Sequence, residues 1–313
     1  VVMAPEKVVP YFGTVEKPEC HLLYNVTTMA STWHTVATKD VSLLRRQLDI
    51  ISELPRDYVF QNYLRCHDDI GWGLDYEYLE NFGIQEVPHK KYLNDFLTGK
   101  YPDSFARGEL YNDDPRLGDA RLCGTTASLC GIERFGFEGN QEGVDRAVRY
   151  DITLHAFMFS QSGIPVIYSG DEIGQVNDYS YKDDPEKSDD SRYLHRGKFD
   201  WKLAENRHDP ATVQGKLFPV LDKLEHIRSS HGIFNSNVPI HTIDTWDNSI
   251  LAFVRENDEE KFIGIYNFSE NDKVAWINEE DGMYTDLISG REMEAKGVQI
   301  PAFGCYWLCR NKQ

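Results

Sequence analysis

Residues 58–72 read YVFQNYLRCHDDIGW, and this stretch decides the fold class that we predict. Its first half is rich in aromatic and β-branched residues and contains neither Pro nor Gly, which is typical of a buried strand of a parallel sheet. His67, Asp68 and Asp69 follow at once, so the strand delivers an imidazole and two carboxylates into a loop. Because neighbouring carboxylates are costly to bury unpaired, they indicate a site that uses negative charge. The alternative is a solvated turn, in which Asp is common.

The composition limits the partners that this chain can have. It holds 51 acidic and 33 basic residues, a formal net charge of −18 over 313 residues. This charge argues against nucleic acid and an anionic membrane as partners, because both require a basic face, and it favours a neutral small molecule. The six cysteines show no CxxC and no metal-ligand spacing, which predicts reduced core thiols, no metal, no cofactor and a cytoplasmic protein.

Strand-like and helix-like segments alternate around the opening stretch. A short apolar run at 20–26 and a longer one at 163–174, GIPVIYSGDEIG, are predicted as further buried strands. The second run also ends in acids, Asp171 and Glu172, which we expect to shape the rim of the site or to pair with loop arginines. Helices are predicted at 38–54, 143–160 and 212–230.

Two regions depart from this alternation. From 73 to 131 the chain is rich in Gly, Tyr and Asp, with one short helix predicted at 89–97. A connection of this length inside a compact domain is usually functional, although a plain surface insertion is the alternative. Beyond about Ile233, short alternating runs separated by turn signals such as Asp281-Gly282 predict an antiparallel sandwich.

Taken in order, the motifs resemble the C-terminal half of α-amylase-superfamily enzymes, glycoside hydrolase family 13, and within it the amylosucrases. Several spaced motifs that match in order are a stronger signal than any one of them. They are NYLRCHDDIGW (62–72), SFARG (104–108), GDARLCGTTASL (118–129), GIPVIYSGDEIG (163–174) and KSDDSR (187–192).

The resemblance implies an α/β fold that is the C-terminal part of a (β/α)8 TIM barrel, followed by an all-β antiparallel sandwich. The last three β/α units of the barrel would occupy residues 1–69 and 132–232. A loop-rich insertion would occupy 70–131, and the sandwich 233–313.

The same resemblance assigns roles to five residues. Asp68 corresponds to a catalytic carboxylate that stabilises an oxocarbenium-like transition state, and His67 to a histidine that hydrogen-bonds the same glucosyl ring. Asp69 and Arg121 correspond to contacts with the acceptor-side sugar. Arg192 corresponds to an arginine that closes the floor of the glucosyl pocket through an ion pair with an acid elsewhere in the barrel.

The activity implied is retaining glucosyl transfer from sucrose to an α-glucan. Such chemistry needs a nucleophile and an acid/base, which the family carries on its fourth and fifth barrel strands. The aligned acid/base falls immediately before Val1, so we expect both groups, with the N-terminal half of the barrel, to be supplied in cis or in trans. Two alternatives are a sucrose hydrolase or other α-glucosidase, and a non-catalytic or carbohydrate-binding remnant. The superfamily includes calcium proteins, but the acids of 183–190 match no calcium-loop spacing.

Overall fold

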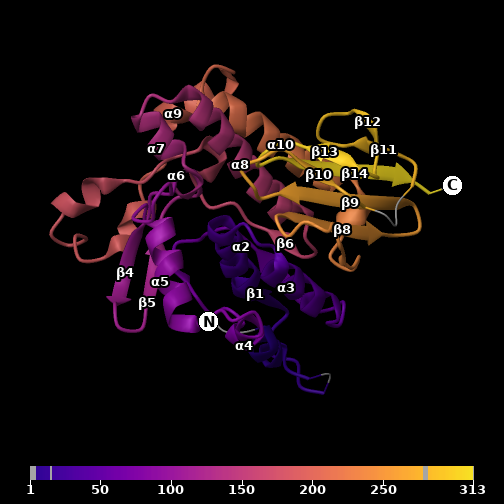
Figure 1. Ribbon diagram of the computed structural model, residues 1–313, viewed down its shortest axis with the longest axis horizontal. Helices are drawn as coiled ribbons and strands as arrows, with labels where there is room; N and C mark the ends of the chain where they lie inside the picture. The colour runs from indigo at the N-terminus through magenta and orange to yellow at the C-terminus, as the bar shows by residue number, and fades with distance from the viewer. Residues whose placement is uncertain (1–4, 15, 278–280, 313) are drawn as a thin grey trace.

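The structure is a computed structural model that describes residues 5–14, 16–277 and 281–312. Three parallel strands form its first sheet, in the order β1 (Leu22–Tyr24), β2 (Val59–Asn62) and β6 (Ile164–Pro165). Helices follow each of these strands, as expected for successive β/α units, and Figure 1 draws them from indigo at α2 to orange at α10.

Two helices, α2 (Val26–Thr38) and α3 (Ser42–Ser52), connect β1 to β2. The prediction of a single helix at 38–54 is correct for α3 and missed α2. The sequence of α2 is rich in Thr and has little helix propensity, but the helix is buried along most of its length. The side chain of Asn25 accepts a hydrogen bond from the Thr28 amide and caps its start, so tertiary packing and the cap determine this helix.

Helices α8 (Gln141–Ser160) and α10 (Val213–Ser230) confirm two further predicted helices, and they pack on each other. The apolar run at 163–174, by contrast, was wrongly predicted to be a strand throughout. Within this run only the two residues of β6 pair with β2, and the chain then bends through Gly170 at φ 101° into the 3-10 helix η2 (Asp171–Ile173).

The insertion that follows β2 has more regular structure than the predicted loop-rich segment. Strands β3 (Ile70–Gly71), β4 (Glu109–Asp114) and β5 (Asp119–Cys123) form an antiparallel sheet in the order β3-β5-β4. Helix α5 (Glu86–Leu97) includes the predicted short helix. The remaining helical elements are α1 (Pro5–Val8), η1 (Val9–Phe12), α4 (Tyr76–Glu80), α6 (Thr126–Cys130), α7 (Ile132–Phe137), η3 (Tyr179–Asp183), η4 (Ser191–His195), α9 (Trp201–Glu205), η5 (Asn206–His208) and η6 (Gly232–Phe234).

The C-terminal part is an antiparallel sheet domain, drawn in orange and yellow at the right of Figure 1. A six-stranded sheet has the order β12-β11-β14-β9-β8-β7 and is accompanied by the pair β10-β13. One face of the large sheet, which includes Phe253 and Trp307, joins the core formed with the helices, and the other face, which includes Ile263, packs with β10 and β13. The strands are β7 (His241–Ile243), β8 (Ile250–Glu256), β9 (Glu260–Asn267), β10 (Lys273–Ala275), β11 (Met283–Asp286), β12 (Glu292–Glu294), β13 (Val298–Ile300) and β14 (Cys305–Asn311).

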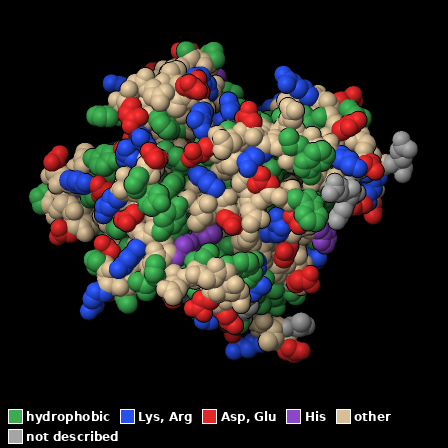
Figure 2. All heavy atoms as spheres, viewed as in Figure 1, with side chains coloured by type: hydrophobic (Ala, Val, Ile, Leu, Met, Phe, Trp, Pro, Cys, Tyr) green, Lys and Arg blue, Asp and Glu red, His purple; other side chains and the backbone are tan. Residues whose placement is uncertain are grey.

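The surface and the thiols agree only partly with the composition-based expectations. In Figure 2 acidic and basic side chains are interspersed with hydrophobic ones, so charge of neither sign is concentrated on that face. All six cysteines are free, but Cys20 is exposed and is therefore not the core thiol that we predicted. Within the described ranges, no helix combines the length and the hydropathy that crossing a membrane requires.

Candidate active site

A buried amide fixes the carboxyl end of β2 relative to its neighbours. The Asn62 side chain accepts a hydrogen bond from Asn25 Nδ2 at 2.8 Å and donates one to the Ser162 carbonyl at 2.8 Å. Asn25 follows β1 and Ser162 precedes β6, so one side chain links all three parallel strands. Active sites of β/α barrels lie at this end of the strands.

Arg65 anchors the loop after β2 through buried contacts. Its Nε lies 2.8 and 3.0 Å from the two Asp171 carboxylate oxygens, and its Nη1 donates to the His195 carbonyl at 3.0 Å. Both members of the Arg65–Asp171 pair are 2 % exposed. Asp171 thus pairs with a loop arginine, as we predicted. Removing either partner of such a pair is costly because the other remains charged and buried.

Asp68 projects from this loop with a partly open carboxylate. Its Oδ1 accepts a hydrogen bond from the Asp69 amide at 3.0 Å and lies 3.3 Å from Arg192 Nη1, and the side chain is 53 % exposed. Partial burial opposes ionisation, but the two hydrogen bonds outweigh it, so the pKa of Asp68 lies below its ordinary value. Asp68 is therefore an ionised carboxylate at neutral pH.

Arg192 comes from η4, far along the sequence, and is rigidly held. Its Nε and Nη2 each lie 2.8 Å from an oxygen of Asp190, and its guanidinium lies 4.7 Å from the centre of the Tyr111 ring. The resemblance implied an ion pair with an acid elsewhere in the barrel. That pairing stays a prediction, and within the described residues the two-pronged partner of Arg192 is Asp190 of the same loop, with Asp68 as the longer contact.

Asp69 and Arg121 also lie together. Asp69 immediately precedes β3, and the pairing of Gly71 with Arg121 on β5 places the two side chains near one another. Arg121 Nε lies 3.9 Å from Asp69 Oδ1, and the two side chains are 37 % and 15 % exposed. Burial and the neighbouring Asp68 charge raise the pKa of Asp69. Two adjacent carboxylates thus have pKa values shifted in opposite directions.

His67 is positioned through its backbone, because its carbonyl oxygen accepts a hydrogen bond from Arg196 Nε. The structure therefore brings the five predicted residues to one end of the sheet. Sequence reasoning missed the supporting residues Arg65, Arg196 and Tyr111, and it considered Asp190 only as a metal ligand. The spacing of two residues between the acid and the arginine in KSDDSR was the signal for that Asp190–Arg192 pair.

The acid-rich loop before Arg192 does not gather its carboxylates into a calcium-like group in the described structure. Asp184 lies 2.6 Å from Lys187 Nζ, and Asp190 is the partner of Arg192. The hydrogen bond from Arg192 and the nearby positive charge hold the pKa of Asp190 below its usual range. These acids therefore neutralise bases of their own loop.

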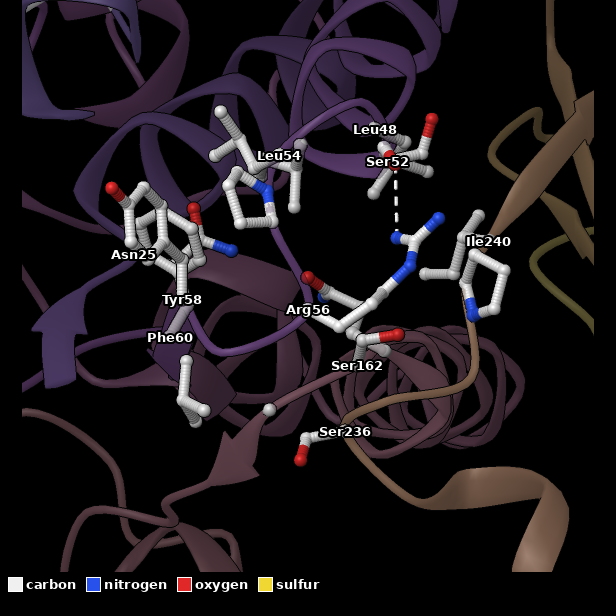
Figure 3. Close-up of a pocket in the computed structure, with 16 residues that line it drawn as sticks. Asn25, Leu48, Ser52, Leu54, Arg56, Tyr58, Phe60, Ser162, Ser236 and Ile240 are labelled. Atoms are coloured by element: carbon white, nitrogen blue, oxygen red, sulfur yellow. Dashed lines mark hydrogen bonds between the residues drawn. The ribbon is translucent and has the colours of Figure 1, made fainter. Parts of the chain in front are cut away.

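The pocket of Figure 3 is separate from this cluster and lies beside the start of β2. Its wall includes Leu48 and Ser52 of α3, Arg56, and the residues that begin β2, and Arg56 donates a hydrogen bond to the Ser52 carbonyl at 2.9 Å. None of the five predicted site residues contributes to it. The acid cluster is thus a partly open surface beyond the carboxyl end of β2, and this pocket is separate from it.

Comparisons with known proteins fit this geometry. No protein-family model matches the chain. A glucosylglycerate phosphorylase from Escherichia coli (strain K12) is 24% identical over 302 residues, which are 96% of this chain and 50% of that protein. A crystal structure of AmyP with maltose has a TM-score of 0.62 at 14% identity, covering 99% of this chain and 54% of that one. A sucrose 6F-phosphate phosphorylase from Thermoanaerobacter thermosaccharolyticum has a TM-score of 0.58 at 18% identity, covering 88% and 47%.

In sequence and in fold, the chain resembles the C-terminal half of α-amylase-superfamily enzymes, glycoside hydrolase family 13, which confirms the predicted resemblance at that level. The chain spans about half the length, 50%, of the glucosylglycerate phosphorylase that it matches. The narrower resemblance to amylosucrases stays a prediction, since the similar proteins above are phosphorylases and an AmyP.

Proposed function

We propose that this chain supplies one side of an active site that transfers a glucosyl unit from an α-glucoside. The observation that carries the proposal is the ionised, partly exposed carboxylate of Asp68 at the carboxyl end of β2, held by Arg192 and the Asp69 amide. Glucosyl transfer develops positive charge at the anomeric carbon, and a fixed carboxylate stabilises that charge more in the transition state than in the ground state.

The neighbouring groups fit a sugar site as well. We assign His67 to a hydrogen bond with the hydroxyl groups of the same glucosyl ring, since its side chain is exposed beside Asp68. We assign Asp69 and Arg121 to the acceptor-side sugar. We assign Arg192 to the floor of the glucosyl pocket. Its pair with Asp190 and its stacking on Tyr111 fix the guanidinium that contacts Asp68.

A retaining mechanism requires two further carboxyl groups about 5–5.5 Å apart, a nucleophile and an acid/base. Asp69 and Asp190, the other two carboxylates of this group of contacts, each face an arginine. We therefore propose that the nucleophile and the acid/base reside on barrel strands of a complementary half, in cis or in trans, and that the present chain does not turn over substrate without it.

The parallel sheet offers a place for that complementary half. Leu22, Tyr24 and Ile164 on its edge strands are 39, 50 and 49 % exposed, although strands of parallel sheets are usually buried on both faces. The relatives are about twice as long as this chain, so additional β/α units are the occupant that we propose for this edge. Closing a barrel removes both open edges at once.

For the donor and acceptor we propose sucrose and an α-glucan, following the H-D-D-I-G-W motif of the opening stretch. The similar proteins bring two alternatives: a phosphorylase would pass the glucosyl unit to phosphate, and an α-amylase-type hydrolase would pass it to water. Incubation of a complete enzyme with sucrose, with and without phosphate, distinguishes the three. Insoluble glucan, glucose 1-phosphate and free glucose are the respective products.

The test of Asp68 joins this chain to an N-terminal half that carries the two missing acids. Asp68→Asn should then lower kcat/KM by about 10²–10³-fold, the loss typical of one group that stabilises transition-state charge. Asp183→Asn, on an exposed part of the acid-rich loop, is the control and should be unchanged. Turnover by Asp68→Asn within tenfold of the parent would contradict the assignment. Calorimetric sugar binding without any turnover would instead favour a carbohydrate-binding role.

A further inference from the structure

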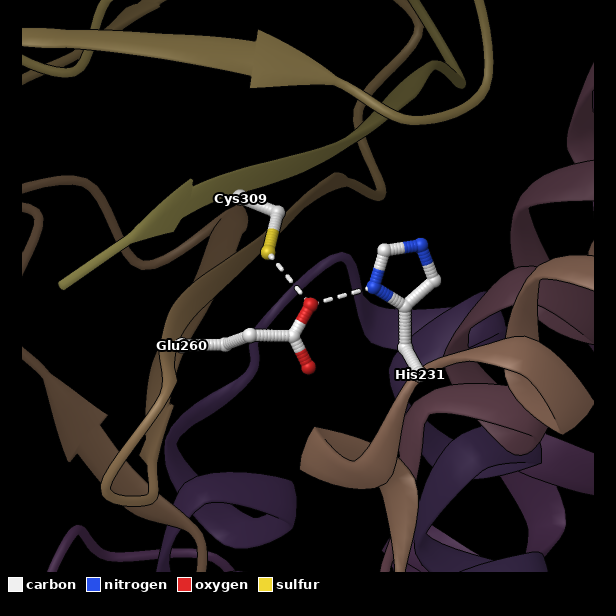
Figure 4. Close-up of side chains that lie close together, drawn as sticks. All are labelled: His231, Glu260 and Cys309. Atoms are coloured by element: carbon white, nitrogen blue, oxygen red, sulfur yellow. Dashed lines mark hydrogen bonds and ion pairs between the residues drawn. The ribbon is translucent and has the colours of Figure 1, made fainter.

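A second group of side chains lies far from the acid cluster, where the last long helix meets the C-terminal sheet. His231 follows α10, Glu260 begins β9 and Cys309 lies on β14 (Figure 4). In the antiparallel pairing of β9 with β14, Cys309 is opposite Phe262, so Glu260 and Cys309 are diagonal neighbours on one face of the sheet. The imidazole approaches them from the helical side.

Three kinds of donor atom converge at this point. The imidazole Nδ1, a carboxylate oxygen and the thiol Sγ all lie within 4.8 Å of one another. Glu260 Oε1 is in direct contact with Nδ1 and lies 3.8 Å from Sγ. The side chains of His231 and Glu260 are 28 % and 11 % exposed, and Cys309 is 5 % exposed. The sulfur is therefore buried while the imidazole opens to solvent.

We propose that His231, Glu260 and Cys309 bind one zinc-type divalent cation, with water as the fourth ligand. Zinc takes nitrogen, oxygen and thiolate ligands at about 2.0–2.3 Å in a tetrahedral arrangement, so an ion between these atoms requires only sub-ångström to ångström movements. Calcium and magnesium prefer sets of oxygen ligands, and this site offers a single carboxylate. On binding, the thiol proton goes to solvent, and the imidazole proton moves by exchange with solvent from Nδ1 to the outer Nε2, which frees the Nδ1 lone pair for the metal.

The surroundings already orient one of the three ligands, Glu260. The Ile233 amide, in η6, lies 3.4 Å from Glu260 Oε2, which leaves Oε1 directed at the imidazole and the thiol. The Glu260 amide donates to Asn257 Oδ1 at 2.7 Å and fixes the turn from which the carboxylate emerges. Outer contacts of this kind hold ligands in place for a metal. Without metal, Glu260 accepts hydrogen bonds from the imidazole and the thiol, which accounts for the arrangement seen here.

The consequence concerns stability and does not depend on the proposed catalytic function. A metal bound here joins the end of α10 to β9 and β14, and a ligand that binds only the folded chain raises the free energy of unfolding. We therefore expect zinc to raise the unfolding temperature of this domain junction.

The experiment uses untagged protein that has been stripped of metal with a chelator. Zinc should bind with a stoichiometry of one and raise the unfolding temperature, whereas magnesium should not. Cobalt(II) at the same site should show a thiolate-to-metal charge-transfer band. Cys309→Ser should abolish this band and weaken zinc binding by at least about 10–100-fold, since loss of an outer contact alone has that effect on metal sites.

Two further variants keep the test decisive. Cys305→Ser, on the same strand and outside the cluster, is the matched control and should keep both the band and the affinity. If Cys309→Ser fails to fold, His231→Gln removes the most exposed ligand and should weaken zinc binding to a similar degree. Unchanged zinc affinity in Cys309→Ser and His231→Gln, or a cobalt spectrum without the thiolate band, would overturn the proposal.

Discussion

The chain contains two sheets whose surroundings differ. In the C-terminal sheet, Phe253, Ile263 and Trp307 are fully buried, on two faces that pack against different layers. In the parallel sheet, the edge residues Leu22 and Ile164 are 39 and 49 % exposed. The first sheet thus completes its packing within the described residues, and the second does not. The difference indicates that the C-terminal sheet stabilises this chain by itself, and the exposed edge of the parallel sheet is the observation behind the partner that we propose.

The largest effects should come from the C-terminal sheet. Phe253→Ala removes a fully buried ring between the sheet and α8, and we expect the free energy of unfolding to fall by about 3–5 kcal/mol. Leu22→Ser, its counterpart on the parallel sheet, should change it by less than about 0.5 kcal/mol in this chain alone. Urea denaturation measures both values.

The complementary half should increase the effect of Leu22→Ser on the free energy of unfolding. When it is present, Leu22→Ser should cost clearly more than 0.5 kcal/mol, on the order of the 1.5–3 kcal/mol for burying a Leu side chain. An equally small effect with and without that half would contradict the docking proposed for this edge.

The next effect concerns the buried Arg65–Asp171 ion pair next to the site. Arg65→Met leaves Asp171 buried without its partner, and we expect a loss of about 3–5 kcal/mol in the free energy of unfolding. The double variant with Asp171→Leu should recover most of this loss, because neither charge then remains. A double-mutant cycle checks the coupling. Additive effects of the two substitutions would show that the pair does not act as a unit.

A smaller effect should depend on pH. The hydrogen bond from Arg192 lowers the pKa of Asp190, so the folded state binds fewer protons there than the unfolded state near and below pH 4. That contribution to stability is complete above the unfolded pKa and is lost as the pH falls through the folded pKa. Arg192→Gln should therefore destabilise the chain at neutral pH and lose this effect in acid. NMR titration should show the Asp190 pKa rising toward its ordinary value, and no rise would contradict the pairing.

The sequence predicted some helices and strands well and missed others, for physical reasons. The strand before His67 and the helices α8 and α10 were predictable, since their apolar patterns agree with their burial. The helix α2 was not, because its Thr-rich sequence is helical only through the Asn25 cap and packing from elsewhere. The apolar run at 163–174 was not predictable either, because only two of its residues pair in the sheet. The chain then bends toward the buried Arg65–Asp171 pair.

The site shows the same division. Motif resemblance located Asp68, Asp69 and Arg192, whose spacing lies within short stretches of sequence. The contacts that fix them, such as Arg65 with the carbonyl of His195, join residues 130 positions apart, and no local pattern carries that information. The predicted roles of the five site residues in sugar transfer stay predictions.

The smallest expected effect lies where the two regions meet. The Lys39 ammonium lies 4.7 Å from the centre of the Phe105 ring and 5.3 Å from that of Phe303, and it donates to the Val36 carbonyl at 2.6 Å. Burial lowers the pKa of Lys39 to about 7, so between that value and its ordinary one the unfolded chain binds more protons and stability should rise with pH. The rings favour the charged form and oppose this shift, so we expect the rise to be smaller than the shift by itself would give.

Lys39→Met tests this junction because it keeps the length of the side chain and removes the charge. The variant should lose the rise in stability between pH 7 and 9 that the parent shows in denaturation experiments. A rise of the same size in both proteins would assign the pH dependence to other groups. Since Phe303 belongs to the C-terminal domain and Lys39 follows α2, a confirmed effect would show that one cation between aromatic rings couples the self-contained sheet to the open one.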